Sequence, residues 1–140
     1  MKKLFNTLML STLFLCTASF ISCEKENTES DLLIGEWECI QGDGYDFITG
    51  VILTFTKDGK FTESYGGFSV SGNYITLSVK DANSKYDYNL KASDETVILI
   101  DAGYGYGESD PLIIKALTSQ NLTVQVYDNN NSAKFKKIKS

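Results

Sequence analysis

The side chains that could carry out chemistry in this chain of 140 residues are few in kind, because it contains no histidine and no arginine. Without histidine, neither a histidine-dependent catalytic triad nor a histidine-ligated zinc site can form. Without arginine, no bidentate clamp for phosphate or carboxylate is available. No turn in the sequence brings together two acidic residues, as a pair of catalytic carboxylates requires. We therefore expect a protein that is not an enzyme and that uses no cofactor and no metal.

Cys39 is expected to be a buried apolar side chain and not a nucleophile. In the stretch LLIGEWECIQ (32–41), Leu33, Trp37 and Cys39 alternate with glutamates. A free cysteine on the apolar face of a strand packs like a small hydrophobic residue, and burial keeps its thiol protonated and unreactive.

Cys23 lies at the end of an N-terminal segment with the properties of a secretory signal peptide over residues 1–22. Lys2 and Lys3 precede an uncharged, mostly apolar run that continues to Cys23. This order of charge, apolar core and small residues is typical of cleaved signal peptides. A transmembrane anchor is the alternative, since nearly 20 uncharged residues could just span a bilayer. Several asparagine, threonine and serine residues make the run a mediocre span.

The residues FISC (20–23) resemble the lipobox of bacterial lipoproteins, although Phe20 stands where leucine is usual. The resemblance implies cleavage before Cys23 and acyl chains on its thiol and new amino group. Cys16 is the competing position, but Leu15 before it is too bulky for the cleavage pocket. Each buried methylene contributes about 0.8 kcal/mol, so several chains on one residue hold a domain to a membrane. We expect a lipoprotein of the Gram-negative cell envelope, on the periplasmic or the surface-exposed face of the outer membrane.

The residues after Cys23 read as a tether followed by one acidic domain. Residues 24–31, EKENTESD, contain no apolar side chain, so 23–31 is predicted to be flexible. The whole chain has a formal charge of -5, which makes nucleic acid an unlikely partner by charge. The one basic cluster, KFKKIKS (134–140), alternates as a strand with lysines on its wet face would.

From residue 32 to 140 the sequence predicts short strands joined by tight turns. Apolar residues recur with period two, and turn pairs separate the runs. The expected turns lie at Asp58-Gly59, Gly72-Asn73, Ser93-Asp94 and Ser119-Gln120. No stretch has sustained helical periodicity. A meander of about 8–10 strands hides its edges by closing, so we expect an all-β, up-and-down antiparallel barrel. A two-sheet sandwich is the alternative, although it usually needs longer crossings.

Four stretches in order resemble the lipocalin-like lipoproteins of Gram-negative bacteria, over residues 32–139. They are GEW (35–37), LTFTKDGKF (53–61), SGNYITL (71–77) and IIKALTSQNLTV (113–124), before a final F-K strand. The resemblance implies a small calycin-like barrel in which the early Trp37 plugs one end. It implies no single activity, because one fold hosts many functions.

The barrel interior is the first candidate site. A barrel of about eight strands is filled by side chains or holds one small ligand, and both alternatives stay open. Glu63 and Thr76 break the apolar alternation, so they either face inward as polar anchors or turn outward at a bulge. The residues expected to point inward are Trp37, Cys39, Val51, Leu53, Phe55, Phe61, Tyr65, Phe68, Val70, Ile75, Leu77, Val79, Ile98, Ile100, Ile113, Leu122, Val124, Val126 and Phe135.

Two loops rich in glycine and tyrosine are the second candidate site. GDGYD (42–46) and DAGYGYGESD (101–110) would place Tyr45 near Tyr104 and Tyr106 if both lie at one mouth. Tyrosine offers contact area and one hydrogen bond, which suits a lid or a recognition loop. A plain flexible loop is the alternative, and the acidic residues match no known calcium loop.

The function expected from these observations is binding of a small apolar or amphipathic ligand in the barrel or at its mouth. The alternative is a packed barrel whose loops dock a protein of the cell envelope. The residues expected to bind the ligand are Trp37, Tyr45, Phe55, Glu63, Tyr65, Leu77, Tyr104 and Tyr106.

Overall fold

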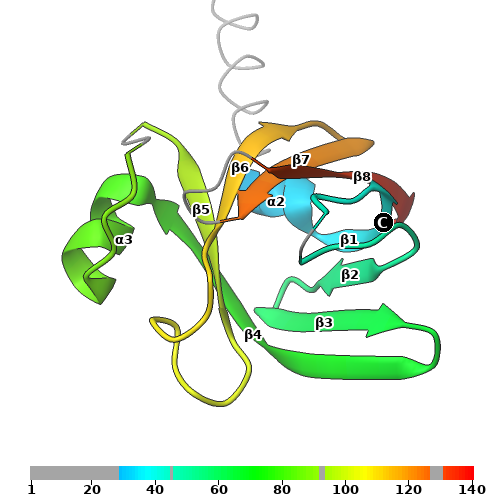
Figure 1. Cartoon of the computed structure of the whole chain (residues 1–140), viewed down its shortest axis with the longest axis horizontal. Helices are drawn as coiled ribbons and strands as arrows, with labels where there is room; N and C mark the ends of the chain where they lie inside the picture. The colour runs from blue at the N-terminus through cyan, green and yellow to red at the C-terminus, as the bar shows by residue number, and fades with distance from the viewer. Residues whose placement is uncertain (1–28, 45, 92–93, 127–130) are drawn as a thin grey trace, which may run out of the picture.

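A computed structural model describes residues 29–44, 46–91, 94–126 and 131–140 of the chain (Figure 1). The predicted signal peptide, the lipidation site Cys23 and Tyr45 lie outside the described residues. Within the described ranges, no helix is long and apolar enough to cross a membrane. Helix α2 (Glu29–Leu33) begins inside the segment predicted to be a tether.

Eight strands form one closed antiparallel barrel in which each strand pairs with the next and β8 pairs with β1. The predicted all-β, up-and-down barrel is therefore confirmed. The strands are β1 (Gly35–Gln41), β2 (Ile52–Phe55), β3 (Lys60–Tyr65), β4 (Phe68–Ser78), β5 (Thr96–Asp101), β6 (Leu112–Leu117), β7 (Asn121–Val126) and β8 (Ser132–Lys139).

The alternating strand direction gives the barrel two unlike ends. One end carries helix α2, the turn after β2, the connection from β4 to β5 and the turn after β6, and we call it the closed end. The other carries residues 42–51, the turn between β3 and β4, and residues 102–111, and we call it the loop end. The two glycine- and tyrosine-rich loops thus lie at the same end, as the sequence analysis expected.

The first predicted hairpin is confirmed and the second is wrong. Gly59, with φ of +84°, lies in the turn between β2 and β3. The next turn is not at Gly72-Asn73 but at Gly66-Gly67, and β4 runs through Gly72 without interruption. A Cβ at Gly72 would lie 2.3 Å from the carbonyl oxygen of Asp101. Glycine at this position therefore allows β5 to approach closely where β4 changes its partner from β3 to β5.

Helix α3 (Val79–Tyr86) was not expected, since no stretch of the sequence has sustained helical periodicity. The helix begins after Ser78, whose side chain accepts a hydrogen bond from the Asp81 amide at 3.1 Å. Its return to β5 is fixed by Asn83, whose side chain accepts from the Leu90 amide and donates to the Leu90 carbonyl, both at 2.9 Å. In Figure 1 the helix projects at the left of the barrel, beside the end of β4.

Helix α3 creates a second apolar cluster outside the barrel. Val79, Ala82 and Leu90 pack there on the outward side chains of β4, β5 and β6. Ile75, Leu77, Val79 and Ile113 were expected inside the barrel and belong to this outer cluster instead. Both faces of the sheet are apolar where the helix covers it, so alternation alone could not identify the inner face.

The barrel interior is lined by the other apolar face of the strands. Its buried side chains include Trp37, Cys39, Val51, Leu53, Phe55, Phe61, Ile98, Leu122, Val124, Val126 and Phe135, all expected inside, together with Leu33, Phe47 and Tyr74. Aromatic rings meet in this interior. The Phe55 and Tyr74 centroids are 5.0 Å apart and the Phe47 and Phe135 centroids are 5.3 Å apart, both edge to face.

The closed end is sealed by helix α2 and Trp37. Leu33 and Trp37 are fully buried, and the Trp37 indole N–H donates to the Leu33 carbonyl at 2.8 Å. The Lys137 ammonium donates to the carbonyls of Leu32 and Ile34, each at 2.9 Å, and lies 4.7 Å from the Trp37 ring centroid. The Lys137 side chain of β8 thereby binds carbonyl groups at the end of helix α2, which have no partner within the helix.

Candidate binding site at the loop end

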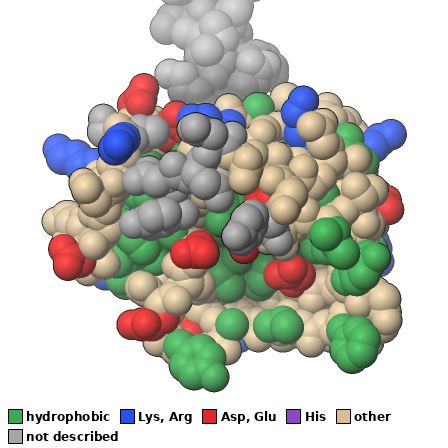
Figure 2. All heavy atoms as spheres, in the orientation of Figure 1, with side chains coloured by type: hydrophobic (Ala, Val, Ile, Leu, Met, Phe, Trp, Pro, Cys, Tyr) green, Lys and Arg blue, Asp and Glu red, His purple; other side chains and the backbone are tan. Residues whose placement is uncertain are grey.

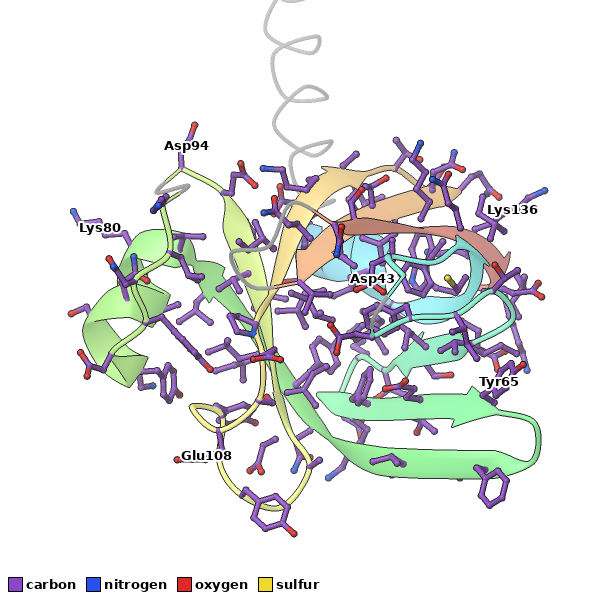
Figure 3. The ribbon with its side chains drawn as sticks, in the orientation of Figure 1. Asp43, Tyr65, Lys80, Asp94, Glu108 and Lys136 are labelled. Atoms are coloured by element: carbon purple, nitrogen blue, oxygen red, sulfur yellow. The ribbon has the colours of Figure 1, made fainter. Side chains whose placement is uncertain are left out.

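The first loop of the loop end is organised by Asp43, which is 7% exposed. Its Oδ1 accepts hydrogen bonds from the Asp46 and Phe47 amides, both at 2.8 Å. This local turn directs Phe47 into the barrel against Phe135. Figure 3 shows Asp43 in the middle of the molecule, inside the ring of strands and loops.

The second loop, residues 102–111, is held at its base and in its middle. Asp101 Oδ1 accepts from the Gly103 and Gly105 amides at 2.8 Å, and these bonds lower the pKa of the carboxyl. The Tyr88 hydroxyl lies 3.0 Å from the Tyr106 carbonyl oxygen and 2.9 Å from that of Ser109. The loop therefore has a defined conformation, which hydrogen bonds hold at several points along its length.

The tyrosines of this second loop have different surroundings. Tyr106 packs against the outer cluster, and its ring centroid is 6.3 Å from that of Tyr86. Tyr104 is 86% exposed. Of these two predicted ligand-binding residues, Tyr104 alone is free to offer its ring to a ligand at the loop end.

The hairpin of β3 and β4 contributes an apolar surface that faces the same side as the barrel interior. Residues directly opposite in an antiparallel sheet point to the same face. Leu53 is buried in the interior and pairs with Glu63, which pairs with Val70. Glu63 therefore points inward, which was one of the two alternatives, and it does so from a half-buried position.

Apolar side chains are exposed at this end to an unusual degree. Among the described residues seven large hydrophobic side chains are exposed, and five of them belong to the loop end: Ile48, Tyr65, Phe68, Val70 and Tyr104. Phe68 and Val70 were expected inside the barrel, but they are 83% and 56% exposed. The hairpin reaches past the neighbouring strands there, so no element covers them. A surface hollow of about 390 Å³ lies beside the hairpin turn, between Gly50, Tyr65 and Phe68.

Carboxylates from both loops and from β3 also interact at this end. Partial burial, and then the charges of Asp43 and Asp110, raise the pKa of Asp46. Burial, and then the charge of Asp46, raise the pKa of Glu63. Asp46 thus lies close enough to Asp43, Asp110 and Glu63 to interact with each of them, although these residues come from both loops and from β3.

The loops and hairpin segments 42–52, 61–71 and 101–114 contain no lysine, whereas Lys134 of β8 is exposed beside Gln41 near this end. The two ion pairs within the described ranges, Lys115–Glu95 and Lys139–Glu36, lie elsewhere. Figure 2 shows acidic side chains across the middle of this face, apolar ones at its right and lower margins, and lysines along its upper edge. The loop end therefore combines apolar side chains with a negative charge that no lysine of these segments balances.

Not all the predicted ligand-binding residues meet at the loop end. Trp37 and Phe55 are buried toward the closed end, and Leu77 lies in the outer cluster. Glu63 and Tyr65 lie on the hairpin, and Figure 3 shows Tyr65 at the end of β3. Four further residues of this end were not among the predicted ligand-binding residues: Asp43, Asp46, Phe68 and Val70.

The described residues contain few groups for metal binding or nucleophilic chemistry at this site. In the ranges that the structure describes, histidine, cysteine, aspartate and glutamate side chains nowhere gather in threes that could hold a metal ion. Cys39 is buried and free, and burial raises the pKa of its thiol. Its burial agrees with its predicted role as an apolar side chain. No protein-family model matches the chain, and no curated protein matches it significantly.

Proposed function

We propose that this protein is a lipid-anchored, lipocalin-like barrel of the cell envelope that binds a small apolar or amphipathic molecule at its loop end. The observation that carries the proposal is the gathering of five of the seven exposed large hydrophobic side chains of the described residues at that end. Apolar side chains grouped on the surface of a soluble domain commonly mark a binding site, because their exposure to water is unfavourable.

Titration of residues 23–140 with N-phenyl-1-naphthylamine tests the ligand site, because this neutral amphiphile fluoresces when it enters an apolar site. We expect saturable binding that Phe68→Ser weakens about fivefold or more. Phe68 is 83% exposed, so the substitution should leave the fold intact. Ile138→Ser on β8, where Ile138 is 47% exposed, is the matched control and should bind as the native protein does. Absence of saturable binding, or an equal effect of both substitutions, would contradict the proposal.

The lipid anchor is tested separately by Cys23→Ala in the full chain. We expect the variant to appear in the soluble fraction of the cell, because the acyl chains have no other point of attachment. Mass spectrometry of the native protein should find an acylated Cys23 at its N-terminus. Membrane retention of the variant, or an intact segment 1–22 on the mature protein, would refute the anchor.

A second candidate function is docking of an envelope protein by the loops of a packed barrel. The edge-to-face contacts among Phe47, Phe135, Phe55 and Tyr74 favour it, because they fill the interior with side chains. This function predicts that a protein partner binds and that its binding requires the residues of the loop end. It also predicts that the purified barrel carries no small molecule. Native mass spectrometry of protein from its own host distinguishes the two functions.

A further inference from the structure

We propose that the ligand bound at the loop end is an amphipathic cation, with an apolar chain and an ammonium-type head group. This inference rests on the proposed function and adds the chemical class of the ligand. The docking surface is the inner face of the β3–β4 hairpin, where Tyr65, Phe68 and Val70 are each at least half exposed. Charge complementarity identifies the occupant of this surface.

Glu63 provides the point at which an amphipathic molecule would change from apolar to charged. It lies on the same face as Tyr65, two residues away along β3, and directly opposite Val70 on β4. On the β2 side, Glu63 lies directly opposite Leu53, which is buried and points to the same face. A carboxylate enclosed by apolar side chains attracts a cation more strongly than one in open water does, because less solvent screens the pair.

The surroundings of Glu63 extend its negative charge. Asp46 acts on the Glu63 carboxyl, and Asp43 and Asp110 act on that of Asp46. Residues 42–52, 61–71 and 101–114 contain no lysine, and Lys134, which pairs with Gln41 near this end, is exposed on the outer face of β8. A bound cation would relieve this repulsion, whereas a carboxylate or phosphate head group would add to it.

The apolar rim argues for a molecule with a chain and against a bare cation. Tyr104 and Ile48 add exposed apolar side chains on the two loops, and they are 86% and 50% exposed. The acidic residues do not form a metal-binding group within the described ranges. The apolar chain of the ligand therefore matches the exposed apolar side chains at this end, and its cationic head group matches the carboxylates.

Three decyl amphiphiles that differ only in head group test the inference by calorimetric titration of residues 23–140, below micelle-forming concentrations. We expect decyltrimethylammonium to bind about tenfold more tightly than decyl maltoside, and decyl sulfate to bind more weakly than both. Glu63→Gln should lower the affinity for the cation about three- to tenfold and leave that for the maltoside unchanged. Glu38→Gln on the outer face of β1 is the matched control and should change neither.

The outcomes separate this inference from the proposed function. Equal binding of the three amphiphiles, or loss of maltoside affinity in Glu63→Gln, would overturn the cationic preference and leave a ligand site. Failure of all three to bind would overturn the ligand site itself. Cation affinity that falls as the pH falls through the range in which carboxylates titrate, with maltoside affinity constant, would support the inference.

Discussion

Replacement of Lys137 by methionine should open the closed end of the barrel. The ammonium donates to the carbonyls of Leu32 and Ile34 at 2.9 Å and lies 4.7 Å from the Trp37 ring centroid. Hydrogen bonds from a charged group contribute about 1.5–3 kcal/mol each, and we take the lower value because the side chain is only half-buried. A cation–π contact adds about 0.5 kcal/mol, and methionine recovers the cost of burying the charge. The expected loss of unfolding free energy is about 2–3 kcal/mol.

Urea unfolding followed by tryptophan fluorescence measures this loss, because the chain contains a single tryptophan and it lies at the closed end. At roughly 4 °C per kcal/mol for a domain of this size, the melting temperature should fall by about 8–12 °C. Lys136→Met is the matched control, since Lys136 is exposed on the neighbouring position of β8. A Lys137→Met variant as stable as Lys136→Met would refute the role assigned to this lysine.

Three further substitutions test other parts of the structure. Gly72→Ala should cost about 2–3 kcal/mol in urea unfolding, because the new Cβ would lie 2.3 Å from the Asp101 carbonyl; a neutral result would contradict this crossing. Asn83→Ala should cost about 1–2 kcal/mol and increase hydrogen exchange at Leu90, since both bonds between them are lost. Burial and the loop-end charge raise the pKa of Glu63 above its ordinary value of 4.5, so native stability should fall as the pH rises from that value to the folded pKa. Glu63→Gln should remove this fall, and an unchanged pH profile would contradict the raised pKa.

The barrel could be predicted because its strands are short and two of its turns, at Asp58-Gly59 and Ser119-Gln120, carry a clear signal. Asp58-Gly59 lies between alternating apolar runs, and β2 and β3 pair across it. The pair Gly72-Asn73 carries the same local signal but lies within a continuous strand. What distinguishes the two positions is the approach of Asp101, which is distant in sequence. A local pattern cannot contain that information.

Helix α3 was missed although a signal for its start was present. Ser78 and Asp81 have the spacing of a capping box, in which the first side chain satisfies the free amide three residues later. The helix has only two turns, so its periodicity is too brief to stand out among strands. Because it was missed, the apolar residues that it covers, such as Leu77, were assigned to the interior.

The arrangement of the two loops could be predicted from the sequence, whereas the side chains exposed around them could not. The two loops lie at the same end because strand direction alternates in a meander, so no side-chain information is needed to predict their common location. The exposure of Phe68 and Val70 depends instead on how far the hairpin extends past its neighbours. The electrostatic coupling of Asp46 to Glu63 joins a loop to a strand and is a property of the folded chain alone.

The pairing between β5 and β6 is the shortest in the barrel, so the number of hydrogen bonds between neighbouring strands is not uniform around the barrel. Its register consists of two pairs, Val97 with Ile113 and Ile98 with Leu112, whereas the β4–β5 register runs over six. Fewer shared backbone hydrogen bonds mean a smaller free energy of local separation. We therefore expect thermal fluctuations to part these two strands first and to leave a transient slit in the side wall. Helix α3 and Tyr106 pack over the outer face of these strands, so the slit would open only when these contacts also loosen.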